Sequence, residues 1–253
     1  MTRSTWRHNM AALAVLSLIL GMVPATLAQS TEEASEIREQ LDIPYTEGSE
    51  AHERQKLDVH GFDEPGDRPI MVFVHGGGWR FGRKDHVQGK PTAFHKRNWV
   101  FASIDYRMHP EVTYQEQGHD VARAIRLVHD HAREFGGSAD KIFLMGHSAG
   151  AHLAALVAID ERYLKSAGLS RTDLAGVILL DGAGYDVARQ IKTSVLPRAK
   201  ELYETVFSRD PERQRDASPI EHVGDGQGIA PFLLVHVARR PDSRVQAQAL
   251  AKR

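Results

Sequence analysis

The sequence predicts an α/β protein with a mostly parallel central sheet and helices on both of its faces. Short, uncharged runs rich in valine, isoleucine, leucine and phenylalanine recur along the chain, and each has the length of a strand. Segments with helical periodicity separate these runs. Strands that alternate with helices form parallel sheets, because each crossover returns the chain to the same end of the sheet. We therefore expect one such domain over residues 29–253.

The strands of this sheet are predicted from two kinds of apolar run. Five runs are almost continuously apolar, as expected for strands that are buried on both faces. They are residues 69–75, 100–105, 141–146, 175–181 and 231–237. Two shorter runs, residues 41–46 and 55–60, are joined by a polar turn and predict an antiparallel pair.

The clearest predicted helix spans residues 115–135. Apolar side chains recur there at helical spacing, and Gly136 and Gly137 end the pattern. Residues 149–159 are small and apolar, which suits a helix buried against the sheet. Further helices are predicted at 90–98 and at 194–207, and the second of these is amphipathic and is expected to belong to a cap over the functional site.

The first 28 residues have the pattern of a secretory signal peptide. Arg3 and Arg7 precede an uncharged run at 10–23, and small residues at 25–28 form a cleavage site after Ala28. An uncleaved membrane anchor is the alternative, but the apolar run is too short to cross a bilayer comfortably, which favours the signal peptide. We expect an exported protein, periplasmic or secreted, with no stable membrane span after cleavage.

Composition excludes several classes of function. The formal net charge is -1, without the basic face that nucleic-acid binding requires. The chain has no cysteine and no HExxH pattern, so we expect neither disulfides nor a metal site. No Lys-Ser or Lys-Thr pair follows the triple glycine at 76–78, as a nucleotide-binding loop would need. We expect no cofactor.

The strongest motif is GHSAG at residues 146–150, between a predicted strand and a predicted helix. In this setting Ser148 lies on a tight turn that exposes its hydroxyl, and Gly146 and Gly150 leave room for the close backbone approach. The N–H of Ala149 then lies at a helix N-terminus, where it can hold a developing oxyanion. The motif predicts that Ser148 is a nucleophile.

The second motif is HGGGW at residues 75–79, directly after the predicted strand 69–75. Such a loop lies at the carboxyl edge of a parallel sheet, where ligands bind. Glycines leave their N–H groups uncovered, so Gly77 and Gly78 are predicted as further oxyanion donors. His75 and Gly76 are expected to support the loop.

Together HGGGW, Asp105-Tyr106-Arg107 and GHSAGAHLAALV resemble the esterase/lipase superfamily of α/β-hydrolases. The resemblance covers residues 54–253 and is closest to the feruloyl-esterase-like and kynurenine-formamidase-like branches. It implies a carboxylesterase that cleaves a small-molecule ester through a serine-bound acyl intermediate, without cofactor or metal.

This fold orders its triad as serine, acid and histidine. Asp242 is the first candidate for the acid, although the expected spacing would place the acid two residues earlier, at the position of Arg240. Asp181 is the alternative. No histidine follows His236, which lies in a predicted strand and precedes the acid. His75, His147 and His152 are expected to pack or to support the motifs.

The sheet would be expected to continue with another strand and a covering helix. We therefore expect residues 231–237 to form an exposed edge, and the chain to be a C-terminally truncated hydrolase. A catalytically inactive binding protein on the same fold is the alternative function. Arg189, Lys192 and Arg198 in the cap fit either a carboxylate-bearing substrate or a solvated face.

Overall fold

The computed structural model describes residues 37–48, 51–224 and 228–253. These described residues belong to one compact unit. The predicted signal peptide lies outside the described residues. Among the helices that are described, none is long and apolar enough to cross a membrane.

A seven-stranded mixed sheet forms the centre of the unit, in the order β1-β2-β4-β3-β5-β6-β7. The pairs β1–β2 and β2–β4 are antiparallel, and every other pair is parallel. This confirms the predicted α/β fold with a mostly parallel sheet. The strands are β1 (Arg38–Pro44), β2 (Lys56–Gly61), β3 (Arg68–Val74), β4 (Val100–Ile104), β5 (Gly137–His147), β6 (Gly176–Leu180) and β7 (Phe232–Val235).

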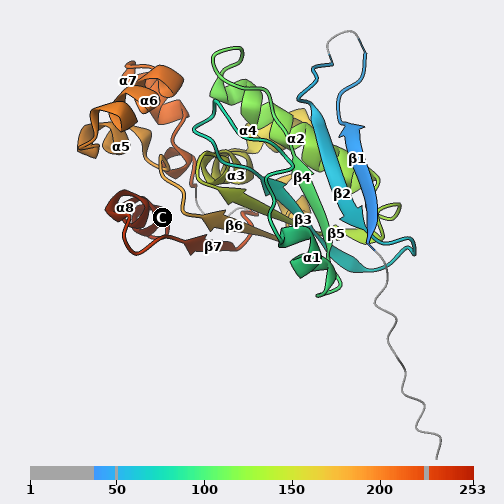
Figure 1. Ribbon diagram of the computed structural model, residues 1–253. Coiled ribbons are helices and arrows are strands. Elements are labelled where there is room, and N and C mark those ends of the chain that lie inside the picture. Colours follow the sequence, from blue (N-terminus) through green and yellow to red (C-terminus); the bar gives the residue numbers. More distant parts are fainter. Residues whose placement is uncertain (1–36, 49–50, 225–227) are drawn as a thin grey trace, which may run out of the picture. The chain divides into compact units, whose positions relative to one another are not determined.

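Helices cover the sheet and form a separate group beside it (Figure 1). They are α1 (Lys90–His95), α2 (Tyr114–Asp130), α3 (Ala149–Ile159), α4 (Glu161–Ser166), α5 (Val187–Thr193), α6 (Pro197–Phe207), α7 (Pro211–Asp216) and α8 (Pro241–Leu250), with short 3-10 turns at Arg171–Asp173 and Pro219–Glu221. We call α5, α6 and α7 the cap. The single helix predicted at 194–207 is shorter, because Pro197 has no N–H to donate and therefore begins a helix.

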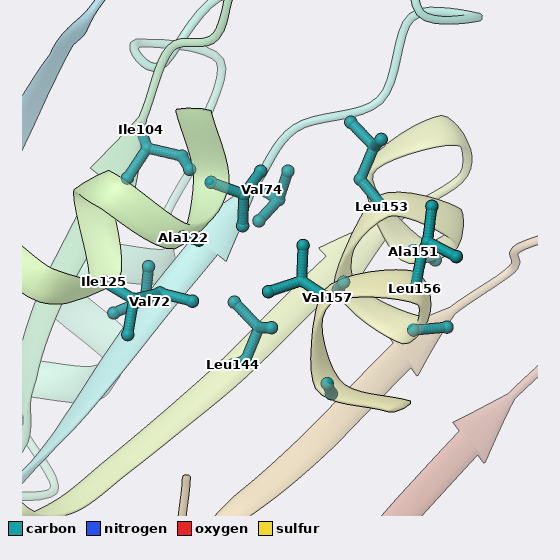
Figure 2. Packing of buried hydrophobic residues seen from close by; sticks show 14 of the residues in the cluster. Val72, Val74, Ile104, Ala122, Ile125, Leu144, Ala151, Leu153, Leu156 and Val157 are labelled. Carbon is teal, nitrogen blue, oxygen red and sulfur yellow. The ribbon is translucent and has the colours of Figure 1, made fainter. Parts of the chain in front are cut away.

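The main core lies between the sheet and helices α2 and α3. Figure 2 shows Val72 and Val74 of β3 and Leu144 of β5 facing both helices. Every residue of α3 is buried, which explains why its sequence is apolar on all sides. This packing fixes α3 against the strands on either side of β5.

The opposite face of the sheet has a smaller core. Met71, Phe73 and Phe101 pack there against Phe94 of α1. Toward the far edge this face is open, since Leu233 and Val235 of β7 are 56% and 46% exposed. Within the described residues β7 pairs with β6 alone, so it forms the exposed edge that the sequence predicts.

A buried ion pair joins α2 to the chain after β4. The carboxylate of Asp120 is fully buried and accepts two hydrogen bonds from the Arg107 guanidinium, at 2.9 and 3.0 Å. Gln55 donates a further bond of 2.8 Å to the same group. Arg107 belongs to the Asp105-Tyr106-Arg107 motif, so this contact fixes the segment that follows β4.

Replacing Asp120 with alanine should destabilise the protein by about 3 kcal/mol or more, because the Arg107 guanidinium then loses its buried partner. Urea unfolding measures the change. The matched control is Asp130→Ala on the same helix, which removes an ion pair of 2.6 Å whose side chains are both about 40% exposed. That loss should stay within about 0.5 kcal/mol. Equal losses for the two variants would contradict the structural role assigned to Asp120.

Candidate active site

Ser148 lies in the turn between β5 and α3. Its backbone has φ 54° and ψ -118°, a combination that non-glycine residues rarely adopt. Its N–H donates a 2.9 Å hydrogen bond to the carbonyl oxygen of Leu180 in the neighbouring strand β6. The strained turn is therefore anchored to the sheet, as a nucleophile elbow requires.

Three glycines make this turn sterically feasible. A Cβ atom at Gly146 would overlap the carbonyl oxygen of Gly150, and one at Gly150 would overlap that of Val74. At Gly76 a Cβ would lie 2.8 Å from the His147 carbonyl oxygen and 3.0 Å from the Ser148 Cβ. The HGGGW loop and the elbow are therefore in direct contact, because they follow β3 and β5, which are neighbours in the sheet.

The glycine loop leaves two amide groups without partners. Gly77 and Gly78 have φ of 132° and 62°, values that favour glycine. The carbonyl oxygen of Gly77 accepts hydrogen bonds from the N–H groups of Arg80 and Phe81, which closes the loop into a turn. Among the hydrogen bonds of the described residues, none uses the N–H of Gly77 or of Gly78 as donor. Both remain available to an oxyanion.

His75 packs next to this loop and supports it. Its buried ring stacks on Tyr106, its Nδ1 lies 2.8 Å from the Gly76 carbonyl oxygen, and its Nε2 lies 3.4 Å from Asp105. Each ring nitrogen thus lies near an oxygen atom, of a backbone carbonyl on one side and of a carboxylate on the other. Burial raises the pKa of Asp105, whereas hydrogen bonds from His75 and from the Lys84 N–H lower it, and the net shift is downward. An ionised Asp105 therefore holds His75 in place.

His152 links the loop to the cap. It accepts a hydrogen bond of 3.3 Å from the Trp79 indole at Nδ1 and donates one of 2.8 Å from Nε2 to the Ala217 carbonyl oxygen. Burial lowers its pKa to about 4, partly offset by the bond to Ala217. With both nitrogens engaged, the ring is a neutral structural bridge and has no free nitrogen to accept the Ser148 proton.

Both candidate acids bind the same arginine. Arg240 donates to Asp181 at 2.7 Å and to Asp242 at 3.0 Å. Asp181 directly follows β6, and burial raises its pKa while the nearby Ser243 hydroxyl and the bonds from the Val237 N–H and Arg240 lower it, with a net decrease. The sequence did not predict Arg240 as part of the site, although Arg240 occupies the position in the chain where the acid was expected.

A cavity of about 170 Å³ brings the predicted residues together. Ser148, Ala149 and Gly78 line it, and so does Asp242, whereas Asp181 does not. The cap contributes Gln190, Leu202 and Tyr203, and Arg240 completes the charged side. The sequence did not single out these cap residues, because an amphipathic helix looks alike whether it covers a site or a plain core.

The imidazole base is not identified by contact with Ser148. No hydrogen bond among the described residues joins the Ser148 hydroxyl to a histidine. His147 lies beside the elbow, where partial burial of its ring lowers its pKa although the Asp181 charge opposes this. His236 follows β7 and has a buried Nδ1 without a partner. Nor do three or more potential metal ligands cluster anywhere in the described ranges.

Ser148 has a strained backbone and contacts a glycine loop whose Gly77 and Gly78 amides have no hydrogen-bond partner among the described residues, at the carboxyl edge of a parallel sheet. This arrangement defines an α/β-hydrolase of the esterase type. The BD-FAE family model matches residues 57–250, and the chain belongs to the BD-FAE family.

Curated relatives are esterases. The chain is 30% identical over 217 residues to the probable carboxylic ester hydrolase LipM of Mycobacterium tuberculosis, covering 82% of this chain and 49% of LipM. It is 33% identical over 182 residues to esterase LipC of the same organism, covering 68% and 44%. The chain thus spans about half the length of the curated relatives it matches.

Solved esterase structures share the fold. Esterase B from Lactobacillus rhamnosis superposes with a TM-score of 0.71 at 20% identity, over 87% of this chain and 71% of that one. The metagenomic carboxylesterase EstE1 superposes with a TM-score of 0.65 at 24% identity, over 86% and 74%.

The buried His152 predicts a loss of stability in mild acid. The folded protein keeps His152 neutral down to a pKa of about 4, whereas the unfolded chain protonates it near 6.5. Above pH 6.5 His152 is neutral in both states and does not affect the free energy of unfolding. As the pH falls from 6.5 toward 4, only the unfolded chain binds the proton, so the free energy of unfolding decreases by about 3 kcal/mol. Urea unfolding at several pH values should show His152→Gln losing less stability over this interval than the unsubstituted protein. Parallel pH profiles would contradict the prediction.

Proposed function

We propose that the protein is a serine carboxylesterase in which Ser148 forms the acyl intermediate. The observation that carries this proposal is the strained Ser148 elbow in contact with a loop whose Gly77 and Gly78 amides have no partner. Non-glycine residues held at such backbone angles cluster at functional sites, and in a strand–turn–helix elbow this conformation presents the serine hydroxyl to a substrate. The curated relatives, which are ester hydrolases, support the same reaction class.

The reaction begins when the Ser148 oxygen adds to the carbonyl carbon of the ester and a base accepts the hydroxyl proton. The carbonyl oxygen becomes negative and receives hydrogen bonds from the amides of Gly77, Gly78 and Ala149. The carbon–oxygen bond to the alcohol then breaks, and the alcohol leaves with the proton. Water attacks the acyl-serine in the same way, which releases the carboxylic acid and restores Ser148. The reaction requires no cofactor.

The acid that orients the base is assigned to Asp242, because its side chain lines the cavity of Ser148. Asp181 is the alternative, since it is bound to the same Arg240 guanidinium. A carboxylate at this position can orient an imidazole base and stabilise the imidazolium that forms.

Binding of esters without turnover is the second candidate function. It is favoured by the absence of a histidine bonded to Ser148 within the described part of the chain. The oxyanion donors alone would still bind and polarise an ester carbonyl.

The experiment that separates the two is hydrolysis of a short-chain nitrophenyl ester together with fluorophosphonate labelling. We expect turnover that falls by about 10⁴-fold in Ser148→Ala, with labelling lost, because the nucleophile is removed. Ser170→Ala, at an exposed serine, is the control and should behave as the unsubstituted protein. Binding of the ester without hydrolysis or labelling would select the second function. Hydrolysis that survives in Ser148→Ala would overturn the nucleophile assignment.

We also infer that residues 1–28 direct export, so that the enzyme acts in the periplasm or outside the cell. The mature chain should then begin at Gln29. Intact mass of the protein recovered from the periplasmic fraction tests this, and an uncleaved chain held in the membrane fraction would contradict it.

A further inference from the structure

A second, larger cavity adjoins the one that contains Ser148. Its volume is about 780 Å³, against about 170 Å³ for the smaller cavity. The two share Gln190, Ala199, Arg240 and Asp242 in their walls. Only a small group fits beside Ser148, whereas the larger cavity has the size of a typical small-molecule site. A substrate that fills both must therefore have one compact and one bulky part.

The charge of the larger cavity is unbalanced. Arg189, Arg239 and Arg240 line it, and Asp242 is its one carboxylate among the described residues. Arg240 is already paired with Asp181 and Asp242. The guanidinium groups of Arg189 and Arg239 form no ion pair with any described side chain. Two uncompensated positive charges thus remain in the wall.

The rest of the wall includes a substantial apolar surface. Val195 and Leu196, between α5 and α6, are 91% and 67% exposed and reach the cavity. Pro241 and Val245 of α8 lie on another side. Covering such exposed apolar side chains with an apolar ligand removes their surface from water, which favours binding. The cavity thus combines sites for hydrocarbon with sites for an anion.

The cap carries other cations that do not share this position. Lys192 and Arg198 are exposed and lie outside the cavity wall. The sequence alone grouped them with Arg189, but the structure separates one cavity residue from two surface residues. Arg198 therefore serves as an internal control for any effect of charge.

We propose that the substrate is an ester whose bulky part is a hydrocarbon ending in a free carboxylate, which Arg189 and Arg239 bind. This inference rests on the proposed function, because the ester group is placed at Ser148. Guanidinium groups bind carboxylates through paired hydrogen bonds, which gives them both affinity and orientation. The chain between the two ends contacts Val195, Leu196 and Val245.

Binding to the Ser148→Ala variant tests the inference without requiring turnover. The probes are monomethyl suberate, which has one ester and one carboxylate, and dimethyl suberate, which lacks the charge. Calorimetry should show the monoester binding about tenfold more tightly, as charge-assisted bonds to two arginines imply. High salt should reduce this preference, because the arginines are exposed to solvent.

Two further variants of the same protein identify the residues responsible. In Ser148→Ala the added pair Arg189→Gln and Arg239→Gln should abolish the preference for the monoester. Arg198→Gln should leave it unchanged. Equal affinity for both probes, or a preference that survives the double substitution, would overturn the inference.

Turnover by the enzyme with Ser148 intact distinguishes this inference from the proposed function. Faster hydrolysis of the monoester than of the diester, lost with Arg189→Gln and Arg239→Gln, supports both. Preferential binding of the monoester with hydrolysis of neither probe nor of the nitrophenyl ester overturns the proposed function and leaves the carboxylate site standing. Hydrolysis of both suberate esters at equal rates, with equal binding, overturns the carboxylate site alone.

Discussion

The site depends on the strained backbone of Ser148, because everything that could act on a substrate is arranged around that turn. A residue held at such angles costs about 1–3 kcal/mol, so the surroundings must determine its conformation. They do so from three sides: β5 is paired with strands on both edges, α3 is wholly buried, and the Ser148 N–H is bonded to Leu180. The same closeness requires glycine at 146 and 150. The core of the protein thus fixes the position of one hydroxyl group.

Around this point the structure arranges charge in two different ways. Next to the glycine loop, the buried His75 is paired with the partly buried Asp105, which stabilises the loop. On the other side, the single positive charge of Arg240 is shared between two carboxylates, and its side chain lines both the small and the large cavity. A carboxylate bound to a guanidinium is a weaker acceptor for a second donor, so Arg240 limits how strongly Asp181 or Asp242 can hold an imidazole.

The strands of the sheet could be predicted because burial on both faces leaves a continuous apolar run, as in residues 69–75. The shared edge of the two glycine motifs also followed, since parallel strands end at the same edge of a sheet. Their direct contact could not be predicted, because it depends on β3 pairing with β5 rather than only with β4. The bond between Arg240 and Asp181 could not be foreseen, because it joins residues 59 apart through the pairing of β6 with β7. Nor could the sequence separate Arg189 from Lys192, since the rotation of a short cap helix is set by its packing and not by its own pattern.

Trp79 couples the position of the cap to that of the glycine loop. Its ring packs on Tyr203 and Phe207 of α6 and on His152 of α3, at centroid distances of 5.4, 4.8 and 5.4 Å. The same residue follows Gly78 directly, so a shift of α6 would also move the glycine loop that we propose as the oxyanion site. During evolution the cap is therefore not a freely exchangeable lid: a new substrate preference that repositions α6 must be accompanied by compensating changes at Trp79 and its neighbours.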